Sequence, residues 1–76
     1  MTPRDHITLA DEAEEQWLAN TRRLLEVARQ ERSETALTRA KIRVDSERFT
    51  RLPDIVKQDL VTMYLRAMMA NGMMFP

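Results

Sequence analysis

The single histidine, His6, is the side chain best suited to catalysis in this chain of 76 residues. General acid–base and nucleophilic catalysis need a second group within hydrogen-bonding reach, such as another His or a Cys. The sequence contains no Cys and no second His. We therefore expect His6 to be an exposed polar residue in a poorly ordered terminal segment, and we expect no catalytic residue and no enzyme activity.

A cluster of carboxylates could in principle bind a hard cation. It comprises Asp11, Glu12, Glu14 and Glu15. Pairs spaced by three and four residues share one face of a helix, but the sequence has no calcium-loop pattern, and a metal site in a helical bundle normally adds Glu-x-x-His. Acidic residues also stabilise the first turns of a helix through its dipole. We therefore expect a solvated helix start, with no metal ion and no other cofactor.

Arginine indicates binding rather than catalysis, because ten of the 12 cationic residues are Arg. Arg32, Arg39 and Arg43 are spaced by seven and four, which predicts one side of a helix, and we call them the Arg stripe. A guanidinium can bind phosphate or carboxylate through two hydrogen bonds, so this stripe could bind nucleic acid, a nucleotide or an acidic partner. The alternative is a solvated helix face. No aromatic residues alternate with the stripe to stack on bases, which favours that alternative.

Apolar spacing predicts an all-α fold with helices at about residues 8–31, 35–51 and 53–71. On the first helix Trp17, Leu24 and Ala28 recur at spacings of seven and four, and we expect them to face the core. The polar residues 32–35 indicate a turn between two antiparallel helices, although one continuous helix stays open. We therefore predict a helical hairpin followed by a third helix.

The third helix differs from the others in being apolar on nearly every side from Leu60 onward. Pro53 marks its start and Gly72 its end. Five of the six Met residues follow residue 62, and Met-rich surfaces suit adaptable protein contacts. The segment docks either on its own chain or on a partner. Trp17 is expected to anchor the core, and it joins the interface candidates because Trp is enriched at binding hot spots. The candidate interface residues are Trp17, Leu65, Met68, Met69, Met73, Met74 and Phe75.

Length and charge limit the class of protein. We expect residues 1–76 to form one domain, and so short a domain buries only about two-thirds of its unfolded surface, which favours a dimer or higher homo-oligomer. The formal net charge is zero, yet residues 1–21 carry net −4 and residues 22–51 carry net +4. This distribution favours antiparallel self-pairing. No signal-peptide pattern is present, and the longest charge-free run, residues 67–76, is too short to span a bilayer, so we expect a cytoplasmic protein.

These features predict a non-enzymatic protein that binds and occludes or bridges a larger protein partner. Small inhibitors and adaptors of phages and mobile elements act in this way, and the link to them is an analogy. The alternative is a nucleic-acid- or nucleotide-binding regulator that uses the Arg stripe. A third hypothesis is attachment of the last segment to a membrane surface, which the absence of flanking basic residues disfavours.

Overall fold

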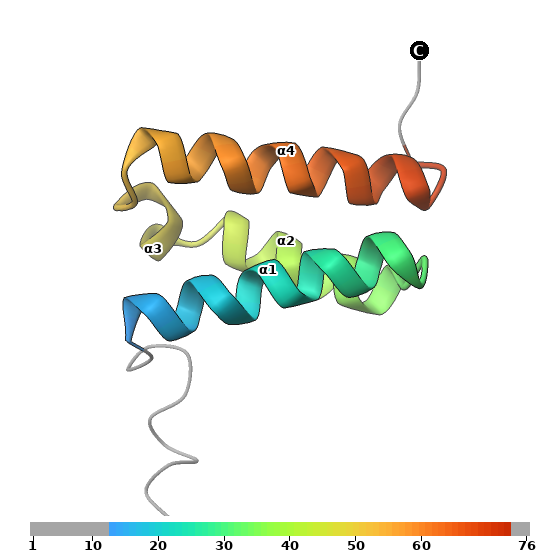
Figure 1. Ribbon diagram of the computed structural model, residues 1–76, viewed down its shortest axis with the longest axis horizontal. Helices are drawn as coiled ribbons and strands as arrows, with labels where there is room; N and C mark the ends of the chain where they lie inside the picture. The colour runs from blue at the N-terminus through green and yellow to red at the C-terminus, as the bar shows by residue number, and fades with distance from the viewer. Residues whose placement is uncertain (1–12, 74–76) are drawn as a thin grey trace, which may run out of the picture.

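A computed structural model describes residues 13–73, which form four helices connected by short loops (Figure 1). The helices are α1 (Glu14–Gln30), α2 (Glu34–Val44), α3 (Glu47–Thr50) and α4 (Asp54–Ala70). No strand occurs within these described residues, and the prediction of an all-α fold is confirmed. His6, Asp11 and Glu12 lie outside the described residues, as do residues 8–10 of the expected first helix.

The three long helices pack against one another. α1 and α4 run in the same direction, and α2 runs in the opposite direction (Figure 1). α4 contacts both α1 and α2, more extensively α1, while the single turn of α3 links the end of α2 to the start of α4. This arrangement leaves each long helix with one side toward the shared core and another side free.

The core is formed by small and medium-sized side chains together with one Trp. Leu25 and Leu60 are its largest fully buried apolar side chains. Leu24, which we expected in the core stripe of α1, is only half-buried, and the buried position next to it belongs to Leu25. Thr21 is buried as well, because its hydroxyl donates a 2.7 Å hydrogen bond to the carbonyl of Trp17 one turn earlier. The stripe is therefore rotated slightly from the expected one.

The region expected as one helix over 35–51 contains two helices, which Asp45 and Ser46 separate. The Ser46 hydroxyl donates a 2.6 Å hydrogen bond to the carbonyl of Arg43, and the Ser46 amide donates to the same carbonyl at 3.1 Å. Short polar side chains compete with helical hydrogen bonds in this way. The break places Phe49 on α3, where it packs against the core.

α1 and α4 end with the same backbone geometry although different residues adopt it. After α4, Gly72 has φ 69°, and the amide of Met73 donates to the carbonyl of Met68 at 2.9 Å. After α1, Arg32 has φ 53°, and the amide of Ser33 donates to the carbonyl of Ala28 at 3.2 Å. Both helices end in a left-handed residue, a conformation that favours glycine. Because no Gly lies near residue 32, the sequence did not indicate the left-handed end of α1.

Candidate functional site

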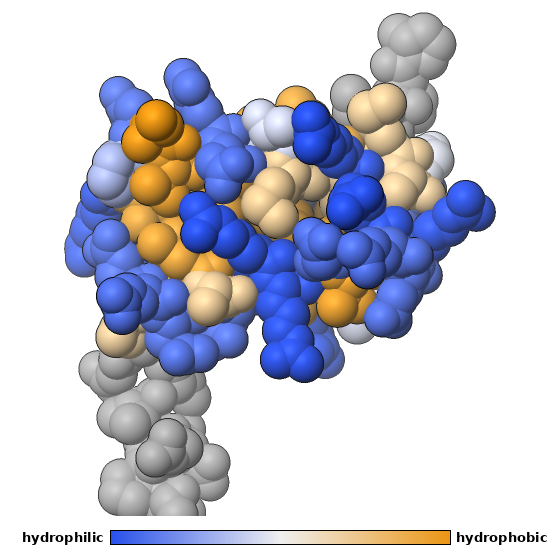
Figure 2. Space-filling view, in the orientation of Figure 1, coloured by the Kyte–Doolittle hydropathy of each residue, from blue (hydrophilic) through white to orange (hydrophobic). Residues whose placement is uncertain are grey.

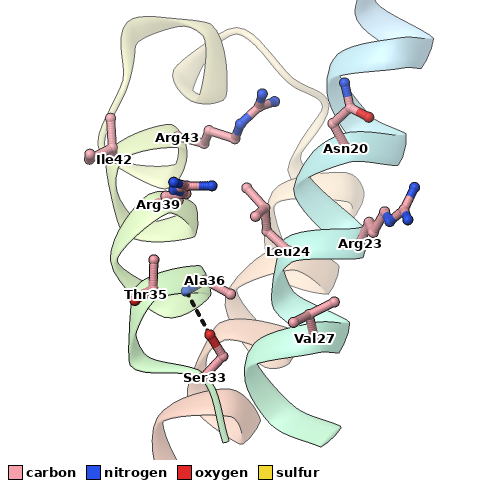
Figure 3. Close-up of a pocket in the computed structure, with 10 residues that line it drawn as sticks. All are labelled: Asn20, Arg23, Leu24, Val27, Ser33, Thr35, Ala36, Arg39, Ile42 and Arg43. Carbon is pink, nitrogen blue, oxygen red and sulfur yellow. Dashed lines mark hydrogen bonds between the residues drawn. The ribbon is translucent and has the colours of Figure 1, made fainter. Parts of the chain in front are cut away.

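A groove of about 590 Å³ lies between α1 and α2, on the side of this helix pair that faces away from α4 (Figure 3). We call it the α1–α2 groove. Leu24 and Val27 of α1 and Ala36 of α2 form its apolar floor. Ser33 closes one end, where its hydroxyl accepts a 3.1 Å hydrogen bond from the amide of Ala36 and caps α2. Ile42 adds an apolar side chain that is 62% exposed.

Three guanidinium groups and no carboxylate line the groove. Arg23 comes from α1, whereas Arg39 and Arg43 come from successive turns of α2 (Figure 3). Arg23 and Arg39 are exposed, and neither guanidinium makes an ion pair or a hydrogen bond with any of residues 13–73. Two cationic groups on opposite walls therefore remain available to an anionic ligand.

Arg43 is held by the protein itself. Its Nη1 donates to the Trp17 carbonyl oxygen at 3.3 Å and to the Thr21 hydroxyl oxygen at 3.2 Å. Its guanidinium carbon lies 5.8 Å from the centre of the Trp17 ring, and the guanidinium carbon of Arg48 lies at the same distance. Contacts of this kind between a cation and an aromatic face are attractive. Arg43 thus joins α2 to α1, and its charge contributes to the groove from a fixed position.

The Arg stripe does not form as expected. Arg32 lies in the loop between α1 and α2 and not on a helix, so it does not continue the row of Arg39 and Arg43. Arg23 takes part instead, and sequence reasoning missed it. Asn20, Leu24 and Val27 lie on the same side of α1 at helical spacing, and this second stripe beside the core stripe is the signal that could have identified it.

α4 carries a second apolar surface on the side opposite the core. Val61, Leu65 and Met69, spaced by four residues, are 39%, 40% and 61% exposed, and Met73 after the helix is 42% exposed. We call Val61, Leu65 and Met69 the outer face of α4. Figure 2 shows hydrophobic side chains at the surface over the second half of α4, apart from another hydrophobic patch over α3 and the start of α4. Ile55, 77% exposed, lies in this first turn of α4.

The other expected interface residues occupy different environments. Trp17 is only 2% exposed and belongs to the core. Met68 is half-buried and packs against the core. Met74 and Phe75 lie outside the described residues. Of the predicted candidates, Leu65 and Met69 lie on one side of α4 by their spacing of four residues, and Met73 is exposed just after the helix.

One exposed ion pair lies on α2 next to the groove. The Lys41 ammonium is 2.9 Å from a carboxylate oxygen of Asp45, four residues later. This hydrogen bond and the charge of Asp45 raise the pKa of Lys41 above its ordinary value. Among residues 13–73, no three His, Cys, Asp or Glu side chains lie close enough together to hold a metal ion.

Comparisons of the chain with protein-family models, curated proteins and solved structures find no match. Within the described residues, no helix combines the length and the apolar character needed to cross a membrane. The function must therefore be argued from the α1–α2 groove and the outer face of α4 alone.

Proposed function

We propose that this chain is a non-enzymatic protein-interaction protein that self-associates through the outer face of α4. One observation carries the proposal: α4 is apolar on two opposite sides. Leu60 and Ala67 are fully buried against α1 and α2, whereas Leu65 and Met69 are exposed on the other side. A helix at the surface of a monomer normally has a polar outer face, so an apolar one indicates a contact.

A second copy of the chain is the partner that fits this face best. The side chains of Val61, Leu65 and Met69 are uncharged, and the exposed Arg66, three residues before Met69, borders the row, so two copies can meet with this charge still solvated at the rim. A twofold axis brings the same patch together from both subunits. With Leu65 near the axis, two antiparallel α4 helices bury the row along its length, and each Å² of buried apolar surface contributes about 25 cal/mol.

Self-association leaves the α1–α2 groove open. The groove lies on the side of the α1–α2 pair away from α4, so a dimer formed through α4 carries two uncovered grooves (Figure 3). Two equivalent sites on one assembly allow it to bridge two molecules or two segments of a larger protein. This geometry supports an adaptor or an inhibitor that acts by occlusion.

Sedimentation equilibrium over a range of concentrations tests the proposal. We expect the wild-type chain to sediment with twice the mass of a single chain at high micromolar concentration. Leu65→Glu, which places a charge in the middle of the outer face of α4, is expected to give a monomer with an unchanged circular dichroism spectrum. Ile55→Glu is the matched control: it makes the same kind of change on the same helix outside this face, and it should leave the dimer intact. A monomeric wild-type chain would refute the proposal, as would a Leu65→Glu dimer.

A further inference from the structure

We propose that the α1–α2 groove binds an acidic amphipathic α-helix of a partner protein. This binding mode rests on the proposed function only in that the chain acts by binding another protein, and it does not require the dimer. The partner helix lies along the groove with its apolar stripe on Leu24 and Val27, while its acidic flanks meet Arg23 on one wall and Arg39 on the other.

The shape of the site favours a helix. Two packed helices form a groove on each side of their contact, and α4 already occupies the groove on the core side. The opposite side offers an open groove of the same kind within residues 13–73. A helix satisfies its own backbone hydrogen bonds, so it can cover an apolar floor such as Leu24, Val27 and Ala36 at no cost in unpaired polar groups. The partner helix would be the fourth long helix, beside α1, α2 and α4.

The charges of the site favour an acidic partner. Arg23 and Arg39 stand on opposite walls, and no carboxylate lines the groove to neutralise them. Neither side chain has an ion-pair partner among residues 13–73. A helix with Glu or Asp on both sides of its apolar stripe places carboxylates next to both guanidinium groups, which bind them through paired hydrogen bonds. Arg43 adds a third positive charge whose position is fixed by Trp17 and Thr21.

The lining favours a protein over a nucleic acid. The surface between the two arginine walls is aliphatic, formed by Leu24, Val27 and Ala36, and no aromatic side chain lines the groove for stacking on bases (Figure 3). A nucleic-acid site usually presents a continuous basic surface to the phosphates. Here the basic groups are separated by apolar surface, which matches the polar–apolar–polar section of an amphipathic helix.

Fluorescence anisotropy with a designed peptide tests the assignment. The probe is a fluorescein-labelled helical peptide of about 18 residues, five turns, with Leu along one stripe and Glu on both flanks. We expect it to bind the full chain, and we expect Arg23→Glu/Arg39→Glu to weaken binding at least about tenfold, because each lost pair becomes a repulsion. Both arginines are exposed, so this variant should retain the wild-type circular dichroism spectrum. Arg66→Glu, the same charge reversal at an exposed site on α4, is the control and should bind as the wild type does.

A charge-swapped peptide makes the test specific. In this peptide Lys replaces Glu, so it should bind the Arg23→Glu/Arg39→Glu variant better than the wild type. Binding of the acidic peptide that is insensitive to the reversal would overturn the assignment, as would tighter wild-type binding of a single-stranded or duplex DNA oligonucleotide. Failure of the acidic peptide to bind at all would also refute it.

Methyl NMR distinguishes peptide binding in the groove from dimer formation through α4. Methyl resonances of Leu24, Val27 and Ile42 should shift on peptide addition, while those of Val61 and Leu65 should not. The Leu65→Glu variant should bind the peptide with unchanged affinity. If that variant instead formed a dimer that Arg23→Glu/Arg39→Glu disrupts, the groove would belong to a second copy of the chain and the assignment to a partner helix would be wrong.

Discussion

The α1–α2 groove and the outer face of α4 both expose aliphatic side chains, and they differ in the charges around them. Arg23 and Arg39 flank the groove on both walls, whereas Val61, Leu65 and Met69 are uncharged and have a single Arg66 beside them. The groove is formed by two helices, while the outer face of α4 is a single convex helix surface. A surface without charge can pair with its own copy, but a surface with one sign of charge repels its copy and selects the opposite sign. We therefore propose different partners for the two surfaces.

The largest expected effect is a loss of folding stability when the buried side of α4, rather than its outer face, is mutated. Leu60 is fully buried and Leu65 is 40% exposed. Leu60→Ala should lower the free energy of unfolding of the chain by about 2–5 kcal/mol, since it leaves a cavity. We expect a much smaller effect at the exposed Met69. In the monomeric Leu65→Glu background, Met69→Ala should change the free energy of unfolding by no more than about 0.5 kcal/mol, as is usual for surface positions. Urea denaturation followed by circular dichroism measures both, and equal losses would contradict the distinction between the two faces.

The peptide complex and the α4 dimer should respond differently to salt. Charge pairs at the rim of the groove are screened as ionic strength rises, so the dissociation constant of the acidic peptide should increase several-fold between low and high salt, roughly 1 kcal/mol of binding free energy. The α4 dimer depends on apolar burial, so its dissociation constant should stay constant or decrease. Anisotropy and sedimentation titrations in a sodium chloride series measure the two responses. A dimer that weakens with salt as steeply as the peptide complex would remove the distinction.

Arg32 offers a test of which arginines define the groove. It has φ 53° in the loop after α1, and Gly adopts that conformation without the steric penalty that an L-residue meets. Arg32→Gly should therefore raise the free energy of unfolding by about 1 kcal/mol, the typical difference for a left-handed helix end. Affinity for the acidic peptide should not change, because Arg32 does not line the groove. A large loss of affinity would instead support the original prediction that Arg32 binds together with Arg39 and Arg43.

The smallest effect is expected at the exposed pair of Lys41 and Asp45, which belongs to neither surface. Because the folded-state pKa of Lys41 is raised, the pair stabilises the fold fully at neutral pH and loses this contribution only as the pH rises through that pKa, above 10.5. Asp45→Asn should move the pKa of Lys41 back toward 10.5, observed through its side-chain resonances in an NMR titration. Peptide affinity and dimer mass at pH 7 should be unchanged. An unaltered Lys41 pKa would show that the pair is not formed in solution.

The sequence allowed much of the local structure to be predicted. The helix expected over 53–71 differs by one residue at each end from α4, because Pro53 and Gly72 restrict the backbone directly. The exposed side chains of Leu65, Met69 and Met73 were likewise indicated by the excess of apolar residues in that helix. Local rules were sufficient where one residue type has one strong conformational effect.

The α1–α2 groove was not predictable in the same way. Arg23 and Arg39 line one groove only because α1 and α2 pack with a particular rotation, and spacing along one helix does not determine that rotation. The buried Thr21 hydroxyl donates to the Trp17 carbonyl and also accepts a hydrogen bond from Arg43, 22 residues away. The left-handed Arg32 has no residue-type signal. For the groove and for Thr21, contacts between distant segments decide the outcome, which propensity alone does not describe.

The two apolar sides of α4 also raise the question of rotational register. A helix with comparable hydrophobicity on opposite sides could turn by half a revolution about its axis and still bury aliphatic groups. Two polar contacts with α1 distinguish the orientations. Asp59 pairs with Arg22 at 3.2 Å, and Asn71 donates to the Ala28 carbonyl at 3.0 Å near the other end of the interface. Exposed ion pairs add little stability, yet in the turned orientation Asp59 would lie far from Arg22 and Asn71 would leave the Ala28 carbonyl. These contacts thus favour the observed orientation of α4, in which Leu60 and Ala67 are buried and the outer face is exposed.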